Sequence, residues 1–296
     1  MFKGFFEHPL VKIFFTVVFT FAVILFLIFL ILFFINRGGD IVETIPDNSI
    51  GVITISGIIT KSEDVIKDLK KFSKDKHIKA VIIKLNSPGG GVVPSQEIYS
   101  EILRIRKKKR VYAYFQSVAA SGAYYIASAC NKIVSNPGSI TGSIGVILEF
   151  TNFEKLFDKL GIKAVVVKSG KFKDTGNPFR PVTEEEKALL NSVVLNIYNQ
   201  FLKAVSINRH IPVEKLKKIA DGRVFSGEQA LHYKLVDQTG TFEDLVDVIK
   251  KECNITGEPK IIYAAKKKNL LNKLIEDSEK AFLKLIETKL YYIKSF

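Results

Sequence analysis

The pattern of hydrophobic and polar positions divides the chain into an apolar N-terminal run, a middle part with short apolar runs, and a helical C-terminal part. Residues 13–35 carry no charge and are interrupted only by Thr16 and Thr20. As a helix that rises about 1.5 Å per residue, this run is long enough to cross a hydrocarbon core of roughly 30 Å. A cleaved secretory signal has a shorter apolar run that ends in a small-x-small site, whereas this run ends in Asn-Arg-Gly-Gly-Asp. We therefore predict that residues 1–37 form a short tip and an uncleaved transmembrane anchor, and that residues 38–48 form a polar stalk.

Short runs rich in isoleucine and valine then alternate with segments that have the hydrophobic spacing of helices. Strands are predicted at residues 49–60, 80–85, 110–115, 132–134, 144–148 and 163–168. Helices are predicted between them, at residues 61–76, 94–108, 121–129 and 152–160. Because strands that alternate with helices form βαβ crossovers, this pattern indicates an α/β fold with a parallel sheet.

From Thr183 onward the pattern is mainly helical. Thr183 and Glu186 have the spacing of a capping box, which predicts the start of a long helix that ends near Arg209. We assign residues 49–265 to one domain and residues 266–296 to an amphipathic C-terminal helix. The apolar stripe of that helix could pack on its own domain, on another subunit or on the membrane surface. Shorter elements are predicted in the last part of the domain: helices at 213–220, 226–232 and 241–251, and a strand at 260–263.

The net charge of +14 comes from 37 lysines and 7 arginines against 30 acidic residues. Lysine reads nucleic-acid grooves less well than arginine, so we expect no nucleic acid as partner. Positive charge also attracts anionic lipid, so we expect a lipid bilayer as partner. Lys3 and Lys12 precede the apolar run, whereas Arg37 after it is offset by Asp40 and Glu43. This bias predicts a single-pass membrane protein with a cytoplasmic N-terminus and an extracytoplasmic body.

One serine lies where a predicted strand is followed by a predicted helix. Ser121 comes after the apolar run 110–115 and opens the segment 121–129. A serine at such a turn can present its hydroxyl as a nucleophile, with the unpaired amides of the first helical turn near developing negative charge. The same position also suits a serine that only caps the helix. Because position 119 is alanine, the segment lacks the G-x-S-x-G elbow of α/β-hydrolases.

A glycine-rich turn precedes this serine in the chain. The segment Asn-Ser-Pro-Gly-Gly at residues 86–90 follows a predicted buried strand and precedes a helix. Glycines there let the backbone come close to a substrate. The amides of Gly89 and Gly122 could form an oxyanion hole, in which one donor is worth about 2.7–4 kcal/mol. The alternative is a plain turn between a strand and a helix.

A nucleophilic serine needs a base, and none of the four histidines lies near Ser121 in sequence. The candidate base is Lys173, in the segment Ser-Gly-Lys-Phe-Lys-Asp at residues 169–174. A lysine must be uncharged to accept a proton, which requires its pKa to fall from about 10.4 to about 7, or about 4 kcal/mol. A like charge such as that of Lys171 favours the uncharged form, whereas a salt bridge opposes it. Asp174 must therefore point away from the lysine amine.

A second small hydroxyl lies between the serine and the lysine in sequence. Ser143, in the segment Thr-Gly-Ser-Ile-Gly at residues 141–145, could orient the lysine amine or could belong to a structural turn. The two cysteines lie far apart and the histidines are scattered, so no set of residues has the spacing of metal ligands. We therefore predict neither a metal nor a cofactor.

Together these segments resemble the signal peptide peptidase A family of membrane-anchored serine proteases with a Ser-Lys dyad. The resemblance covers about residues 50–240, and its motifs occur in the same order as in the family. The family's usual Ser-Gly-Gly is Ser-Gly-Ala at 121–123 here. The motifs are Asn-Ser-Pro-Gly-Gly at 86–90, Ala-Ala-Ser-Gly-Ala-Tyr-Tyr-Ile-Ala at 119–127, Thr-Gly-Ser-Ile-Gly-Val at 141–146, Ser-Gly-Lys-Phe-Lys-Asp at 169–174 and Phe-Ser-Gly-Glu-Gln-Ala…Leu-Val-Asp at 225–237.

The resemblance implies a fold like that of Clp protease and crotonase subunits. It also implies that Ser121 is the nucleophile, that Lys173 is the general base and that Ser143 orients the lysine. In similar single-repeat forms, homo-oligomeric rings place the lysine of one subunit beside the serine of its neighbour. If that holds here, Ser121 and Lys173 of one isolated chain should not be within hydrogen-bond reach.

Three hypotheses for the function remain open at this point. The first is an endopeptidase that cleaves remnant signal peptides and other apolar peptides through an acyl-enzyme. The second is an acyl-CoA enzyme on a crotonase-like scaffold, and the third is a catalytically silent membrane scaffold whose C-terminal helix recruits partners. The sequence leaves open the subsite preference, the physiological substrate, the subunit number and whether Lys173 acts within its own subunit.

Overall fold

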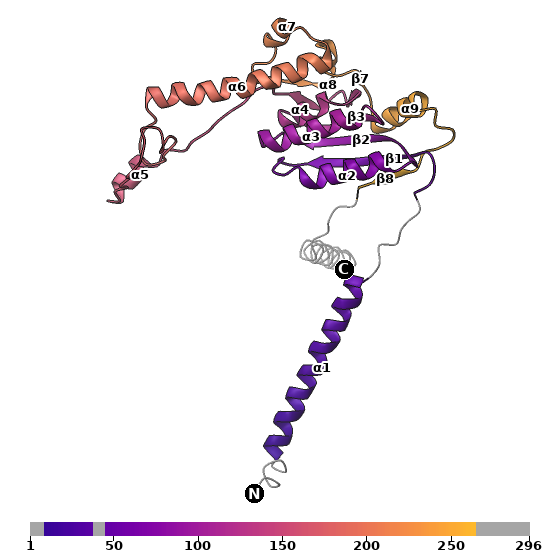
Figure 1. Cartoon of the computed structure of the whole chain (residues 1–296), viewed down its shortest axis with the longest axis vertical. Coiled ribbons are helices and arrows are strands. Elements are labelled where there is room, and N and C mark those ends of the chain that lie inside the picture. Colours follow the sequence, from indigo (N-terminus) through magenta and orange to yellow (C-terminus); the bar gives the residue numbers. More distant parts are fainter. Residues whose placement is uncertain (1–8, 38–44, 265–296) are drawn as a thin grey trace, which may run out of the picture. The chain divides into compact units, whose positions relative to one another are not determined.

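The computed structural model describes residues 9–37 and 45–264, which belong to two separate compact units divided after Thr44 (Figure 1). The first unit contains α1 (Pro9–Arg37), in which residues 13–30 have a mean hydropathy of 3.0. By length and composition α1 can cross a membrane, which is compatible with the predicted anchor. Three predicted segments lie wholly or mostly outside the described residues: the tip at 1–8, the stalk at 38–48 and the C-terminal helix at 266–296.

Within the described residues, the second unit is built on an eight-stranded sheet with the strand order β6-β5-β3-β2-β1-β8. Its central strands β1 (Ser49–Ser56), β2 (Ile78–Ser87) and β3 (Arg110–Ala120) pair in parallel. The shorter strands are β4 (Lys132–Ser135), β5 (Ile140–Gly142), β6 (Val224–Ser226), β7 (Gln238–Thr239) and β8 (Ile261–Tyr263). β4 pairs with β3 and β7, and β5 pairs with β6 in the antiparallel direction. The predicted α/β fold with a mainly parallel sheet is confirmed.

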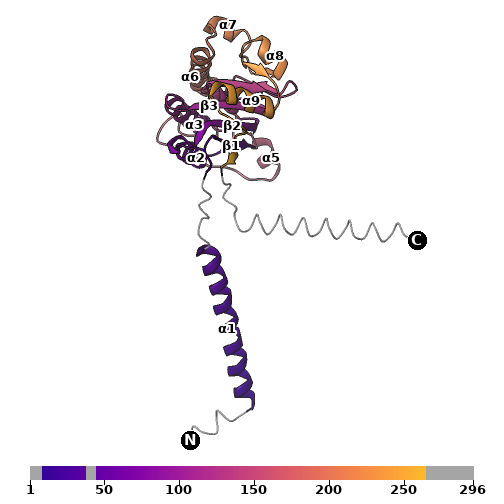
Figure 2. The same cartoon turned by 90° about the vertical axis from the view of Figure 1, so that its right-hand side faces the viewer.

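Helices cover both faces of the central strands, as expected for a parallel sheet. Ile82 and Ile83 are neighbours in β2, so their side chains point to opposite faces, and both are fully buried. The helices α2 (Glu63–Lys74), α3 (Val92–Ile105) and α4 (Gly122–Ser128) pack on the Ile83 face, and α9 (Phe242–Glu252) packs on the Ile82 face (Figure 2). Because the strands are parallel, the ends of β2 and β3 meet at one edge, where the glycine turn and Ser121 follow them.

The long helix α6 (Glu184–Arg209) begins at the predicted capping box. The Thr183 hydroxyl accepts a hydrogen bond from the Glu186 amide, and the Glu186 carboxylate accepts one from the Thr183 amide. The second half of α6 buries Phe201 and Val205 in the core, whereas its first half is mostly exposed. Two shorter helices, α7 (Val213–Lys217) and α8 (Gly227–His232), follow it.

Residues 147–182, which we call the arm, extend beyond the sheet together with the first half of α6 and carry α5 (Glu154–Lys159) (Figure 1). The predictions of strands at 144–148 and 163–168 are wrong for this chain, because neither segment forms a strand. Ile144 is buried in the core, but several other apolar side chains of these segments remain in solvent: Ile147, Val165 and Val167 are 87%, 87% and 96% exposed. A residue with high β-propensity adopts a strand only where a strand edge and a packed surface are close, and the arm leads away from the sheet.

Candidate active site

Ser121 lies in a strained turn between β3 and α4. Its φ of 52° and ψ of −120° are unusual for a residue with a side chain, and such a conformation costs about 1–3 kcal/mol. The turn is held by its backbone, because the Ser121 amide donates to the Gly142 carbonyl at 2.9 Å and the Ser121 carbonyl accepts from the Tyr125 amide at 2.8 Å. The capping alternative is wrong, since the side chain makes no capping hydrogen bond. Strain of this kind is typical of turns that expose a nucleophile.

The glycine turn and the start of α4 are in direct contact. A Cβ atom on Gly89, whose φ is 108°, would lie 2.8 Å from the Gly122 amide nitrogen and 2.8 Å from the Ser121 Cβ. Only glycine allows this approach. The Gly89 amide donates to the Ser87 hydroxyl at 3.1 Å, and the next amide along the turn is that of Gly90. The Gly90 amide nitrogen lies 3.4 Å from the position of a Cβ atom on Gly122, so the turn offers a second candidate donor that the sequence did not single out.

A cavity of about 480 Å³ lies beside the serine. Ser121, Gly122 and Ser143 line it together, so the structure brings three of the predicted site residues to one place. The Ser143 amide donates to the Arg223 carbonyl at 2.8 Å, which fixes this residue at a φ of 49°. Apolar side chains form much of the remaining wall: Val92, Tyr125, Val146, Ile147, Ile197 and Phe201. Ser95, Gln96 and Asp221 also line the cavity, so its wall is mainly but not wholly apolar, which suits a largely apolar ligand.

Lys173 lies apart from this cavity. It is exposed in a turn of the arm, where its amide donates to the Gly170 carbonyl at 3.2 Å. Within the described residues, no hydrogen bond joins Lys173 to Ser121, and Lys173 does not line the cavity. The arm is attached to α6 at Glu186, whereas the cavity meets α6 at Ile197, about 16 Å further along the helix. Within one chain, therefore, the structure does not bring Lys173 together with Ser121.

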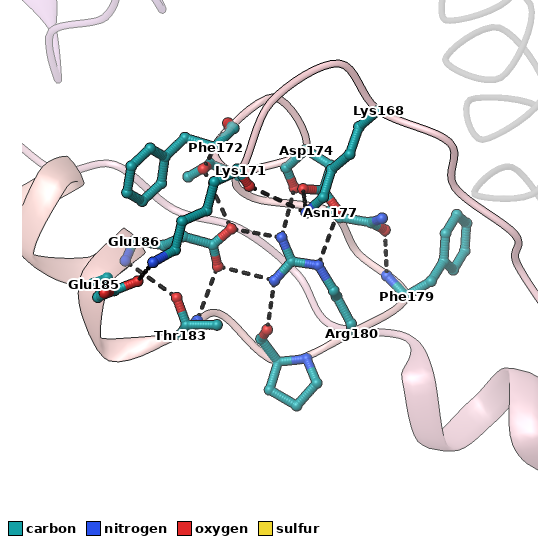
Figure 3. Close-up of polar contacts among 12 residues, drawn as sticks. Lys168, Lys171, Phe172, Asp174, Asn177, Phe179, Arg180, Thr183, Glu185 and Glu186 are labelled. Atoms are coloured by element: carbon teal, nitrogen blue, oxygen red, sulfur yellow. Dashed lines mark hydrogen bonds and ion pairs between the residues drawn. The ribbon is translucent and has the colours of Figure 1, made fainter.

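An ionic cluster attaches the lysine loop to the start of α6 (Figure 3). The Arg180 guanidinium lies between two carboxylates, with its Nε 3.0 Å from Asp174 Oδ2 and its Nη1 2.9 Å from Glu186 Oε2. Lys168 Nζ lies 2.5 Å from Asp174 Oδ1. Sequence reasoning missed Arg180. The signal that could have found it is composition. The chain uses arginine rarely, and arginine, unlike lysine, supplies a planar, bidentate donor.

The cluster stabilises the ionised forms of its acids. Hydrogen bonds from Arg180 and Lys168 hold the pKa of Asp174 far below its usual range. Hydrogen bonds from Arg180 and from the Thr183 amide lower the pKa of Glu186 to about 2. A carboxyl group whose pKa is depressed by folding contributes stability above its usual pKa of 4.5, and loses that contribution as the pH falls toward its folded value.

Glu186→Gln is therefore expected to loosen the junction of the arm and α6 at pH 7 and to have a smaller effect near pH 2. At neutral pH the variant loses the ionised partner of Arg180, whereas near pH 2 the native glutamate is itself about half protonated. Hydrogen exchange of residues 183–190 measures this, with both proteins compared at the same pH so that the intrinsic exchange rate cancels. Equal exchange in the two proteins at pH 7 contradicts the prediction.

The described residues contain no group of three or more His, Cys, Asp or Glu side chains placed to hold a metal ion. This part of the molecule is the edge of a Clp-protease-like α/β sheet with a strained serine beside an apolar cavity.

Two family patterns match the chain. That of Peptidase family S49 matches residues 104–256, and that of Clp protease matches residues 37–139. The first match covers Ser121, Ser143 and Lys173, and it covers more than half of the sequence. The chain belongs to peptidase family S49, and this membership supports a protease.

Similar proteins come from several lineages. A provisionally named protease from Synechocystis is 42% identical over 68% of this chain and 73% of its own length. A provisionally named signal peptide peptidase SppA from Enterococcus faecium is 39% identical over 68% of this chain and 59% of its own length. The chloroplast serine protease SPPA of Arabidopsis thaliana is 32% identical over 77% of this chain and 33% of its own length. The chain thus spans between a third and three quarters of these relatives, whose names support a serine protease.

Proposed function

We propose that this chain is a membrane-anchored serine endopeptidase in which Ser121 is the nucleophile and Lys173 of a second copy is the general base. The observation that carries the proposal is the strained turn that presents Ser121 at an apolar cavity, beside the Gly122 amide. Membership of peptidase family S49 supports the reaction class.

The reaction needs only protein groups and water. Ser121 Oγ attacks the scissile carbonyl carbon while the uncharged Lys173 amine accepts the hydroxyl proton. The Gly122 amide and an amide of the glycine turn, from Gly89 or Gly90, donate hydrogen bonds to the oxyanion. The lysine then gives the proton to the leaving amine, the C–N bond breaks, and an acyl-enzyme remains. Water, deprotonated by the same lysine, attacks the ester, and the product acid leaves with the serine regenerated.

Two features of the single chain support a dyad that is shared between copies. Within the described residues Lys173 makes no hydrogen bond to Ser121, and the arm exposes Ile147, Val165 and Val167. Apolar side chains that are exposed close together in sequence can belong to interaction surfaces. A second copy that packs on the arm would bury these side chains. The lysine loop of the first copy would then lie at the cavity of the second. Ser143 lines that cavity and would accept a hydrogen bond from the entering amine.

The substrate class follows from the cavity and the anchor. Apolar walls around a small polar centre favour apolar peptides, and remnant signal peptides are peptides of that kind. The provisional name of the Enterococcus relative also supports this substrate. α1 would hold the protease in the bilayer where such peptides are released, with the N-terminus in the cytoplasm and the body on the opposite side.

Labelling of the full chain in detergent with a serine-directed fluorophosphonate tests the proposal. We expect one adduct, mapped to Ser121 by mass spectrometry, and its loss in Ser121→Ala. Apolar peptides should be cleaved by the same preparation and protected by the label. Peptide cleavage that continues after complete labelling of Ser121, or an active preparation without an adduct there, contradicts the proposal. An acyl-CoA enzyme would instead turn over thioesters and leave the peptides intact.

A further inference from the structure

A lysine can act as a base only where its surroundings favour the uncharged amine, and several residues near Lys173 in sequence are acidic. Its amine must be uncharged, and a carboxylate beside it would oppose this by stabilising the ammonium. Asp174 is the next residue in the chain, and the first turn of α6 adds more acids to the same region. The charged groups drawn around the loop in Figure 3 are Lys168, Lys171, Asp174, Arg180, Glu185 and Glu186, and Glu184 precedes the last two in the chain.

Every carboxylate in this set is paired with a cation other than Lys173. The pairs are Asp174 with Lys168 and Arg180, Glu186 with Arg180, Glu185 with Lys171, and Glu184 with Lys187. Within the described residues, no ion pair includes Lys173, although four acids lie in or next to its loop. The loop and the first turns of α6 therefore pair these four acids with other cations, and the Lys173 amine has no ion pair within the described structure.

We propose that Arg180 is a positioning residue for the base: it holds the Asp174 carboxylate on the side of α6, away from the Lys173 amine. The proposal rests on the proposed function, in which Lys173 is the general base. Arg180 acts through Asp174 and touches neither the substrate nor the reacting atoms.

The geometry explains why an arginine occupies this position. One guanidinium binds Asp174 through Nε, at 3.0 Å, and binds Glu186 through Nη1 and Nη2, at 2.9 and 2.5 Å. Nη2 also donates to the Asp174 carbonyl at 3.2 Å, so both the side chain and the backbone of Asp174 are held. Glu186 is almost fully buried and is itself fixed by the Thr183 amide at 2.9 Å. A lysine has no planar fork of donors and could not bridge both carboxylates in this way.

Protonation cannot remove the charge of Asp174, so its position has to be controlled. Hydrogen bonds from Arg180 and Lys168 keep the pKa of Asp174 far below its usual range, and the carboxylate is therefore ionised wherever the protein works. Only 11% of its side chain is exposed, which limits screening of its charge by water. If Arg180 were absent, the aspartate could turn toward the neighbouring amine and pair with it.

A double-mutant cycle on the full chain in detergent tests this, with kcat/KM for an apolar peptide measured as a function of pH. The rate should rise with pH as the base loses its proton. Arg180→Met is expected to move the midpoint of this rise upward by about one pH unit, because a carboxylate near an amine shifts its titration by roughly 1–3 units. Asp174→Asn alone should leave the midpoint in place, and Arg180→Met combined with Asp174→Asn should restore it. Arg180→Lys should give an upward movement as well.

A purely structural role for Arg180 predicts a different outcome. Arg180→Met would then lower the rate equally at every pH, and Asp174→Asn would not restore it; either result overturns the proposal. Lys168→Met provides a second route if Arg180→Met does not fold, because it frees the other oxygen of Asp174 and should raise the midpoint in the same direction. Arg104→Met is the matched control, since Arg104 pairs with the buried carboxylate of Glu101 on α3, just as Arg180 pairs with the buried Glu186, and its midpoint should equal that of the native protein.

The cycle also separates this proposal from the proposed function. If Lys173→Met is as active as the native protein, Lys173 is not the base and the proposed function fails first. If Lys173→Met is inactive while Arg180→Met keeps the native midpoint, the base assignment stands and only the role of Arg180 is contradicted.

Discussion

Ser121→Ala is expected to abolish peptide hydrolysis, with a loss in kcat on the order of 10⁶-fold, because the covalent route through the acyl-enzyme disappears. The fold should be unaffected. The turn at Ser121 is held by backbone hydrogen bonds to Gly142 and Tyr125, and the side chain contributes no cap to α4. Alanine and serine have similar strain at a φ of 52°.

Steady-state kinetics and thermal unfolding of the full chain in detergent check this prediction together. The matched control is Ser117→Ala, which removes an exposed hydroxyl from the same strand, β3, and should keep native activity. Residual turnover in Ser121→Ala above about one per cent of the native rate, with the unfolding temperature unchanged, contradicts the assignment of the nucleophile.

Lys173→Met is expected to reduce kcat by about 10²–10⁴-fold, the usual contribution of a general base. KM should change little, because the amine would transfer a proton, whereas the apolar walls of the cavity would bind the peptide. The side chain is exposed in a turn and makes no ion pair within the described structure, so its replacement should not destabilise the chain. The loss would then report on chemistry and not on folding.

Lys215→Met on α7 is the matched control for this variant, since it removes another exposed lysine far along the chain from the arm. Fluorophosphonate labelling of Ser121 should slow in Lys173→Met and stay at the native rate in Lys215→Met. A Lys173→Met protein that hydrolyses peptide and reacts with the label at native rates contradicts the role of Lys173 as base.

Much of the sheet could be predicted because its signals are local. The buried strands β1, β2, β3 and β4 are short runs made mostly of apolar residues, and the start of α6 follows from the capping box at Thr183 and Glu186. The strands predicted at 144–148 and 163–168 show the limit of this reasoning. Their isoleucine and valine content is typical of strands, but a strand also needs a partner edge, and a single chain provides none in the arm.

The candidate site also has a part that could be predicted from the sequence and a part that could not. Ser121, Gly89 and Gly122 follow strands of one parallel sheet, so their meeting at one edge could be expected from the order of elements. The separation of Lys173 from Ser121 depends on the course of the arm, which has no signature in the sequence. Arg180 lies outside every motif that carried the resemblance, and its role depends on contacts with Asp174 and Glu186 that only the folded loop creates.

The most direct test of the central claim is peptide hydrolysis by mixed oligomers, prepared by co-expression of full-length Ser121→Ala and Lys173→Met chains. Each variant alone is expected to be inactive. If the serine of one copy uses the lysine of its neighbour, random mixing at equal amounts restores about a quarter of the sites, and hence about a quarter of the native rate. A mixture as inactive as its two components, from oligomers shown to contain both chains, would contradict a dyad shared between subunits.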